Sequence, residues 1–228
     1  MKFYLAIAVL SVAAVTESFA GWSVSGSTQY IKGAYLGDEE SSLKLLNLGV
    51  RYTAESWSAT ASLPVVIEMD GGLGDLFFSG SYDLVEEFFW LPDISVTSQL
   101  KAPTAKDGLG TGQWDLATGL NFRKTAGPWL GFADLGYAFI GDTDAADFNN
   151  SITYGLGAGR FLCDGDCSFL LYYQGSGSIL DGYPPARQLS LGINYRLSPS
   201  LLGTLIGSKG FNSSSQKYVL AAGVQFQI

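Results

Sequence analysis

Hydrophobic and polar residues alternate along most of the chain after residue 20. The stretch Lys101–Lys124 shows this best, because a polar, glycine-rich loop leads into a run with an apolar or Thr side chain at every second position. These alternating residues are Trp114, Leu116, Thr118, Leu120 and Phe122. Period-two alternation predicts a β-strand with one apolar and one polar face. The polar face carries Asp115, Asn121 and Arg123, which suits the wall of a water-filled barrel.

The same alternation recurs in twelve segments after Gly21, each close to the roughly 9 to 11 residues that a tilted strand needs to cross a bilayer. They run over 22–33, 43–53, 56–68, 74–84, 92–102, 112–123, 128–139, 150–161, 166–176, 187–197, 200–209 and 217–228. Short connections alternate with longer polar ones, as periplasmic turns and external loops do. The pattern therefore predicts an all-β fold: a transmembrane antiparallel β-barrel of about 12 strands, of the bacterial outer-membrane type.

Two connections depart from the rule of short and long connections. Residues 68–73 are short for an external loop, and residues 85–91, VEEFFWL, are long for a periplasmic turn. The aromatic run of this turn, Phe88, Phe89 and Trp90, is interpreted as an interfacial cluster, with a plug of the barrel mouth as the alternative.

Aromatic residues gather near the predicted strand ends, as in the two girdles of membrane barrels. The predicted periplasmic girdle contains Tyr52, Trp57, Tyr82, Phe122, Trp129, Phe169, Tyr195 and Phe226. The predicted external girdle contains Tyr30, Trp114, Phe139, Tyr154, Tyr173 and Tyr218. A soluble β-sandwich would instead bury its aromatic residues in mid-strand, so this distribution favours a membrane setting.

The first twenty residues have the form of a secretory signal peptide. Lys2 precedes an apolar run over residues 3–15, and Ser18 and Ala20 supply small residues before the expected cleavage. We therefore predict a signal peptide over 1–20, a single barrel domain over 21–228, and export to the outer membrane of a Gram-negative bacterium. After residue 20 there is no uninterrupted apolar run of about 18 residues, so no transmembrane helix is expected.

Composition supports the barrel and narrows the function. The mean hydropathy of +0.19 and the 15% of charged residues contrast with the roughly one quarter of charged residues usual in soluble domains. A net charge of −8 argues against nucleic acid as a partner. The chain has no histidine, so a Ser-His-Asp site cannot be built. We predict no catalytic residue, no cofactor and no enzymatic activity.

The inward-facing polar residues are the candidate site. Those proposed to line the lumen are Arg51, Asp75, Asp83, Asp93, Lys101, Asp115, Arg123, Asp134, Gln174 and Arg196. Charges of both signs need partners or water, so they form either a mixed-charge wet lumen or a salt-bridged plug. Twelve strands give a backbone diameter of roughly 24 Å, and inward side chains leave about 12 to 14 Å. Such an opening admits small solutes.

Cys163 and Cys167 bracket an Asp-Gly-Asp turn. In an oxidising periplasm they could close a short disulfide loop. The alternative is a metal site that also uses Asp164 and Asp166, but no histidine or second cysteine pair completes a ligand set, so no metal is predicted.

Five ordered blocks resemble the outer-membrane proteins associated with the phenol meta-cleavage pathway. The blocks are GLGD at 72–75, KAPTAKDGLGTGQWD at 101–115, DLGYAFIGD at 134–142, PPARQLSLGINYRLSP at 184–199 and SKG at 208–210. The matched positions are Gly72, Gly74, Asp75, Lys101, Gly108, Gly110, Gly112, Asp115, Gly141 and Asp142. The resemblance implies a transporter-like or channel-like barrel, often for aromatic or hydrophobic compounds. Turn geometry and close strand approach account for most of these glycines.

The sequence thus supports an outer-membrane channel or transporter in which small, hydrophobic or aromatic solutes diffuse passively through a mixed-charge lumen. The alternative is a structural or interaction barrel with a plugged lumen and acidic external loops. Its loop acids, Asp38, Glu39, Glu40, Asp142, Asp144 and Asp147, would bind a partner or divalent cations. Expected partners are outer-membrane lipid, the barrel-assembly machinery and a small-molecule solute.

Overall fold

The computed structural model of the chain describes residues 20–33, 42–67, 71–144 and 146–228, and most of them lie in strands. The strands are β1 (Gly21–Lys32), β2 (Ser42–Thr53), β3 (Trp57–Val66), β4 (Gly72–Leu73), β5 (Leu76–Val85), β6 (Asp93–Ala102), β7 (Asp115–Ala126), β8 (Trp129–Phe139), β9 (Ser151–Leu162), β10 (Cys167–Ser176), β11 (Arg187–Ser198), β12 (Leu201–Gly210) and β13 (Tyr218–Gln227). One short 3₁₀ turn, η1 (Cys163–Gly165), joins β9 to β10.

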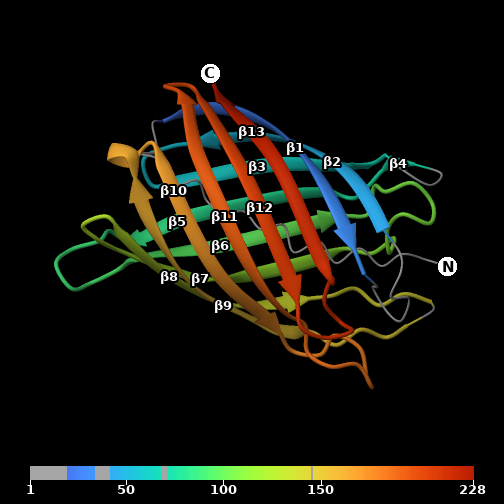
Figure 1. Ribbon diagram of the computed structural model, residues 1–228. Coiled ribbons are helices and arrows are strands. Elements are labelled where there is room, and N and C mark those ends of the chain that lie inside the picture. Colours follow the sequence, from blue (N-terminus) through green and yellow to red (C-terminus); the bar gives the residue numbers. More distant parts are fainter. Residues whose placement is uncertain (1–19, 34–41, 68–70, 145) are drawn as a thin grey trace.

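Twelve of these strands form a closed antiparallel barrel (Figure 1). Each pairs with its neighbours in the chain, and β1 pairs with both β2 and β13, which closes the sheet. The two-residue β4 is an appendage that pairs only with β3. Closure leaves no open sheet edge, which a strand surrounded by lipid could not tolerate. The predicted β-barrel fold of about 12 strands is therefore confirmed.

The strand predicted over 112–123 is the one whose boundaries differ most from the structure, since β7 spans Asp115–Ala126. Gly112 has a φ of 72°, a left-handed conformation that ends an extended strand. Trp114 therefore belongs to the loop, where it is exposed. The alternation that suggested an earlier start continues through three residues that are not paired in the sheet.

The pairing register fixes the shape of the barrel. The ladder from Arg51 on β2 runs through β3, β5, β6, β7 and β8 to Ser151 on β9. The ladder from Gly157 on β9 runs through β10, β11, β12, β13 and β1 to Leu43 on β2. The first ladder ends six residues from the start of the second on β9, and the second ends eight residues from Arg51 on β2. The register therefore advances by about 14 residues per circuit of the barrel. For 12 strands this advance corresponds to a strand tilt of about 40° and a backbone diameter of about 24 Å.

The barrel has an apolar outer face and a mainly polar inner face. Exposed apolar side chains recur at alternate positions of the strands, among them Leu48, Val50, Leu120, Leu156, Leu171, Leu191, Leu205, Leu220 and Val224. The opposite face carries buried Ser23, Ser58, Ser168, Ser190, Asn194 and Ser208. This distribution of apolar and polar side chains is the reverse of that in a soluble protein and matches a sheet surrounded by lipid. No helix in the described part of the chain is long and apolar enough to cross a membrane.

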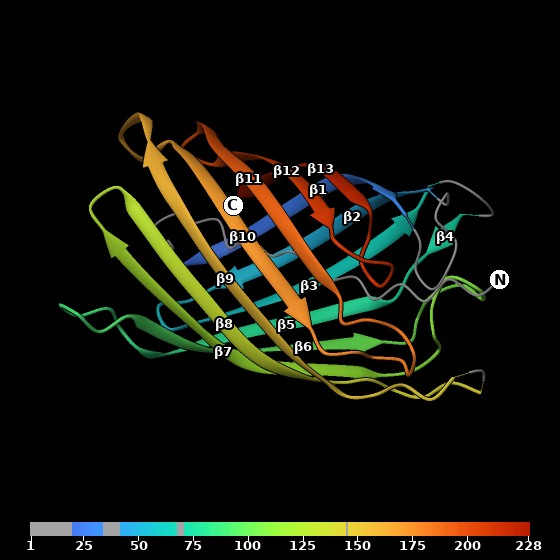
Figure 2. The same cartoon turned by 60° about the horizontal axis from the view of Figure 1, so that its bottom comes forward.

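The two ends of the barrel differ in their connections (Figures 1 and 2). Short turns at 54–56, 127–128, 163–166 and 199–200 lie at the end that also holds the C-terminus. We call this the turn end and the opposite end the loop end. The β5–β6 turn, residues 86–92, is the long turn at the turn end and projects beyond its neighbours in Figure 2.

Aromatic contacts occur at both ends. At the turn end, the ring centroids of Trp22 and Tyr52 are 5.0 Å apart and those of Tyr52 and Trp57 are 5.3 Å apart. At the loop end, Tyr137 and Phe139 have ring centroids 4.9 Å apart. Residues 1–19 of the predicted signal peptide lie outside the described residues. The loop acids Asp38, Glu39 and Glu40 lie within 34–41, which is also outside them.

Candidate functional site

Three predicted lumen residues meet in one ion cluster at the loop end. Lys101, at the end of β6, lies between two carboxylates: its Nζ forms an ion pair with Asp115 and lies 4.0 Å from Asp75 Oδ2. The ammonium group also donates to Thr111 Oγ1 at 2.8 Å. The side chains of Asp75 and Lys101 are only 7% and 5% exposed. They therefore hold structure together and offer little surface to a lumen, in contrast to the expectation that they line it.

This cluster fastens the β6–β7 loop, residues 103–114, to the barrel. Asp75 Oδ1 accepts a hydrogen bond from the backbone N–H of Ala105 at 3.0 Å, and Asp115 Oδ1 accepts one from Gly141 at 3.0 Å. A side chain at Gly110 would stand 2.7 Å from Asp75 Oδ2. Three of the five blocks that carry the family resemblance, 72–75, 101–115 and 134–142, thus converge on one place. Their residue types are explained by the cluster, in which two aspartates surround one lysine and Gly110 lets the backbone approach Asp75 closely.

The same loop also makes an apolar contact. Leu109 packs against a buried cluster on the inner face, formed by Ile31, Leu45, Val66 and Val219. The loop therefore reaches past β5 to the sector of β3 and β4, where Lys106 donates its backbone N–H to Leu73 O at 2.9 Å. At the loop end the opening is consequently narrower than the barrel wall alone would make it.

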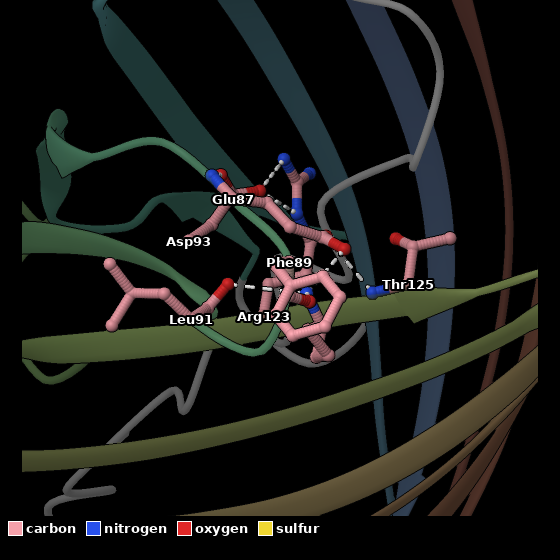
Figure 3. A network of polar contacts seen from close by, with 7 residues as sticks. Glu87, Phe89, Leu91, Asp93, Arg123 and Thr125 are labelled. Atoms are coloured by element: carbon pink, nitrogen blue, oxygen red, sulfur yellow. Dashed lines mark hydrogen bonds and ion pairs between the residues drawn. The ribbon is translucent and has the colours of Figure 1, made fainter.

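A second polar network holds the β5–β6 turn at the other end (Figure 3). Arg123 on β7 forms an ion pair with Asp93 at 2.6 Å, and Asp93 Oδ1 accepts the backbone N–H of Glu87 at 2.6 Å. Lys124 pairs with Glu87 at 3.0 Å and donates to the carbonyl oxygens of Phe89 and Leu91. The side chains of Arg123 and Lys124 thus fix the turn to β7.

The aromatic tip of this turn is held away from the barrel. Phe88, Phe89 and Trp90 are 78%, 86% and 77% exposed. Phe89 has a φ of 48°, and Phe88 and Leu91 exchange two backbone hydrogen bonds beneath it. A side chain this exposed does not fill the lumen, so the tip is not a plug in this conformation. The interfacial interpretation remains a prediction.

Acidification is expected to loosen the β5–β6 turn. The hydrogen bond from Lys124, reinforced by the backbone N–H of Thr125, lowers the pKa of Glu87 below its usual 4.5. A carboxylate with a lowered pKa contributes stability that is present above pH 4.5 and is lost as the pH falls through the lower folded-state value. A spin label at Phe89→Cys, with Cys163 and Cys167 replaced by serine, should become more mobile as the pH falls below 4.5 and through the lowered pKa of Glu87.

Two matched variants identify the responsible group. Glu87→Gln should make the label mobile already at pH 7 and abolish the acid transition. Asp93→Asn, which removes the neighbouring carboxylate, should leave a transition that still depends on Glu87. A Glu87→Gln label that is as immobile at pH 7 as the label on the otherwise wild-type protein would contradict the role of the Glu87–Lys124 pair.

The remaining predicted lumen residues lie along the wall. Arg51 on β2 donates to Ser58 Oγ at 2.9 Å, and Arg196 on β11 pairs with Asp166 of the β9–β10 turn at 3.6 Å. Asp134 on β8 accepts the hydroxyl of Tyr172. Gln174 on β10 stands opposite Gln188 in the register, and Asp83 stands opposite Ser95 beside a β-bulge. Every ion pair among the described residues joins neighbouring strands or a strand and its adjacent turn.

An aromatic ledge covers the inner face of β9. The rings of Phe132 on β8 and Tyr172 on β10 are stacked, with centroids 5.4 Å apart and an interplanar angle of 29°. They can lie flat because β9 presents glycines there: a Cβ on Gly155 would stand 2.1 Å from the Tyr172 hydroxyl, and one on Gly157 would stand 2.2 Å from the Phe132 ring. We call Phe132 and Tyr172 the ledge.

Sequence reasoning missed the ledge. Phe132 and Tyr172 occupy inward positions of their strands, paired in the register with Gly157 between them. The available signal was the glycine at every second residue in Gly155–Gly159, since bare inward positions on one strand leave room for rings from both neighbours. That signal requires knowing which strands are adjacent and in which register.

The two cysteines are free thiols in the structure, with Cys163 exposed. Cys163 and Asp164 both have positive φ, 53° and 56°, in the tight turn between β9 and β10. A Cys163–Cys167 disulfide stays a prediction for the oxidised protein. Within the described residues, no group of three or more Cys, Asp or Glu is arranged to hold a metal ion.

Comparison with known proteins identifies the fold. No protein-family model and no curated protein matches this chain. Among solved structures, the COG4313 outer membrane channel from Pseudomonas putida F1 is 14% identical with a TM-score of 0.70, over 93% of this chain and 97% of that one. The KdgM porin is 10% identical with a TM-score of 0.63, over 90% and 99% of the two chains.

A third similar structure is the CymD monoaromatic hydrocarbon channel, 11% identical with a TM-score of 0.56 over 92% of this chain and 89% of that one. At such identities the likeness concerns the fold. The chain therefore has the architecture of outer-membrane channels and porins, and the names of these three proteins describe channels and porins.

Proposed function

We propose that this protein is an outer-membrane channel through which small solutes diffuse passively. The observation that carries the proposal is the arrangement of inward charges. Arg123 and Arg196 pair with acids on neighbouring strands or turns, and Arg51 bonds to a serine on the next strand. Charges neutralised along the wall leave the axis of the barrel open to water, whereas a plug would need pairs across it.

Hydrophobic or aromatic solutes fit this channel best. The ledge supplies a flat aromatic surface on the inner wall, and aromatic rings stack favourably on such surfaces. The resemblance of the sequence blocks to the phenol meta-cleavage outer-membrane proteins agrees with this solute class, as does the similarity in fold to a monoaromatic hydrocarbon channel. The protein would reside in the outer membrane after removal of its signal peptide.

Planar bilayer recording tests the proposal. Purified, refolded protein should give discrete conductance steps in KCl, because an open lumen of about 12 Å passes hydrated ions. Heat-unfolded protein from the same preparation serves as the control. Silent bilayers, combined with circular dichroism of an intact barrel, would contradict the channel and favour a structural or interaction barrel.

A further inference from the structure

Arg51 lacks a carboxylate partner, unlike the other inward-facing basic residues of the described strands. Lys101, Arg123 and Arg196 each pair with an aspartate. For Arg51 no acidic oxygen of the described residues lies within 4.0 Å, and its polar side-chain contact among these residues is the single hydrogen bond to Ser58 Oγ. A guanidinium group has five N–H donors. The other donors therefore have no hydrogen-bond partner among the described residues.

The surroundings of Arg51 are hydroxyl-rich and small. Ser58 bonds to Ser81 at 2.9 Å on the next strand, and Ser23 stands opposite Arg51 on β1. Ser23 in turn accepts a hydrogen bond from Gln225 at 3.2 Å. Short neutral side chains on both flanks leave space for an anion at the guanidinium and do not compete for its charge.

The ledge lies on the opposite wall. In the closed barrel β2 and β9 are six strands apart in either direction, which makes them diametrically opposed. Arg51 is near the turn end of β2, and its ladder reaches Ser151 at the loop end of β9. Six steps of about 4.8 Å at a tilt of about 40° raise this ladder by about 18 Å.

Six residues back along β9, from Ser151 to Gly157, lower the position again by about 15 Å. The Phe132 ring of the ledge lies against Gly157. Arg51 and the ledge therefore face each other across the lumen at nearly the same height. The gap between them is about 12 Å once the side chains are allowed for.

We propose that the lumen binds small arylalkanoate anions, with the carboxylate on Arg51 and the aromatic ring on the ledge. A charge-assisted hydrogen bond takes about 2.8 Å of the gap and a ring contact about 3.5 to 4.0 Å. The remaining length, about 5 Å, suits a ring joined to a carboxylate by a short chain. The proposal rests on the channel function and names its solute class.

Asp134 gives the solute a direction. Its carboxylate lies beside the ledge, where it accepts the Tyr172 hydroxyl. A second carboxylate placed there would be repelled, whereas an uncharged ring would not. The anionic end of the solute is therefore directed toward Arg51. Neutral aromatic alcohols and short aliphatic acids would each satisfy only one half of the site.

Titration calorimetry of the refolded full-length barrel in detergent, with 3-phenylpropionate as the probe, tests the site. Arg51→Gln should weaken binding about ten- to a hundredfold, through loss of a charged hydrogen bond. Arg51→Lys should give an intermediate loss, and Phe132→Leu a loss of about three- to tenfold. Arg187→Gln removes an exposed arginine at the start of β11 and should leave binding unchanged.

Two further ligands test the carboxylate half and the ring half of the site separately. Butyrate lacks the ring and 3-phenylpropanol lacks the charge, so each should bind wild type at least about tenfold more weakly than 3-phenylpropionate. Equal binding of 3-phenylpropionate to wild type and Arg51→Gln, equal binding of butyrate, or no binding to wild type overturns the inference. Electrophoretic mobility with and without heating reports folding, and Arg51→Lys and Phe132→Leu carry the test if Arg51→Gln does not refold.

Conductance of the same preparations separates this inference from the proposed function. Discrete steps in KCl without binding of 3-phenylpropionate would overturn the two-point site and leave the channel standing. Binding that depends on Arg51, together with silent bilayers, would support the site and overturn passive conduction.

Discussion

Replacing Lys101 by methionine is expected to lower the free energy of unfolding by about 3 to 5 kcal/mol. The substitution keeps the volume of the side chain but leaves the carboxylates of Asp75 and Asp115 without their cation, and Asp75 is only 7% exposed. It also removes the bond to Thr111 that holds the β6–β7 loop. Urea titration of the refolded barrel, followed by tryptophan fluorescence, measures the loss.

Two variants show whether burial of charge is the cause. Lys209→Met changes an exposed lysine on β12 and should leave stability nearly unchanged. The triple variant Asp75→Asn, Lys101→Met, Asp115→Asn removes all three charges and keeps acceptors for Ala105 and Gly141, so it should recover most of the loss. A Lys101→Met barrel as stable as wild type would contradict this account of the cluster.

Gly119→Val is expected to destabilise the barrel by about 1 to 3 kcal/mol. Gly119 on β7 stands opposite Gly136 on β8, and a Cβ there would lie 2.6 Å from the carbonyl oxygen of Leu135 and 2.8 Å from the Cα of Gly136. These are backbone atoms of a paired strand, so they cannot move aside without lengthening the hydrogen bonds of the β7–β8 ladder. Valine's preference for strands does not offset that clash.

Gly131→Val is the matched control on β8. Gly131 is exposed, and a Cβ built on it would meet no atom within 4 Å. The same residue type introduced there should change the free energy of unfolding by less than about 0.5 kcal/mol. Equal urea midpoints for the two variants would show that the close approach of β7 and β8 at Gly119 is not limiting.

The strands and their faces were predictable because they depend on local pattern. Leu116 and Leu120 point outward and Asn121 inward, as the alternation predicts, since the side-chain period of a strand is two whatever its neighbours are. The order of short and long connections predicted which end each turn occupies. The departure at 68–73 has a local cause as well, because Gly72 and Leu73 fold back on β3 as a small extra strand.

The candidate site was only partly predictable. The charged residues named from the sequence include every member of the Asp75, Lys101 and Asp115 cluster, but alternation alone suggested separate positions along a lumen wall. Burial of Lys101 follows from the fold of the β6–β7 loop, which has no periodic pattern. The ledge was not predicted at all, because Phe132 and Tyr172 touch only through the bare glycines of the strand between them.

The sequence by itself therefore determined the barrel, the direction of its strands and the side chains that face inward, because each of these follows from a period of two residues and from turn length. Tertiary structure decided which inward side chains meet. Register and tilt set the height of every residue on the wall, so they brought Lys101 to two acids and left Arg51 facing the ledge across the lumen. Register and tilt both depend on all the strand pairs around the barrel, and no single segment of the sequence encodes them.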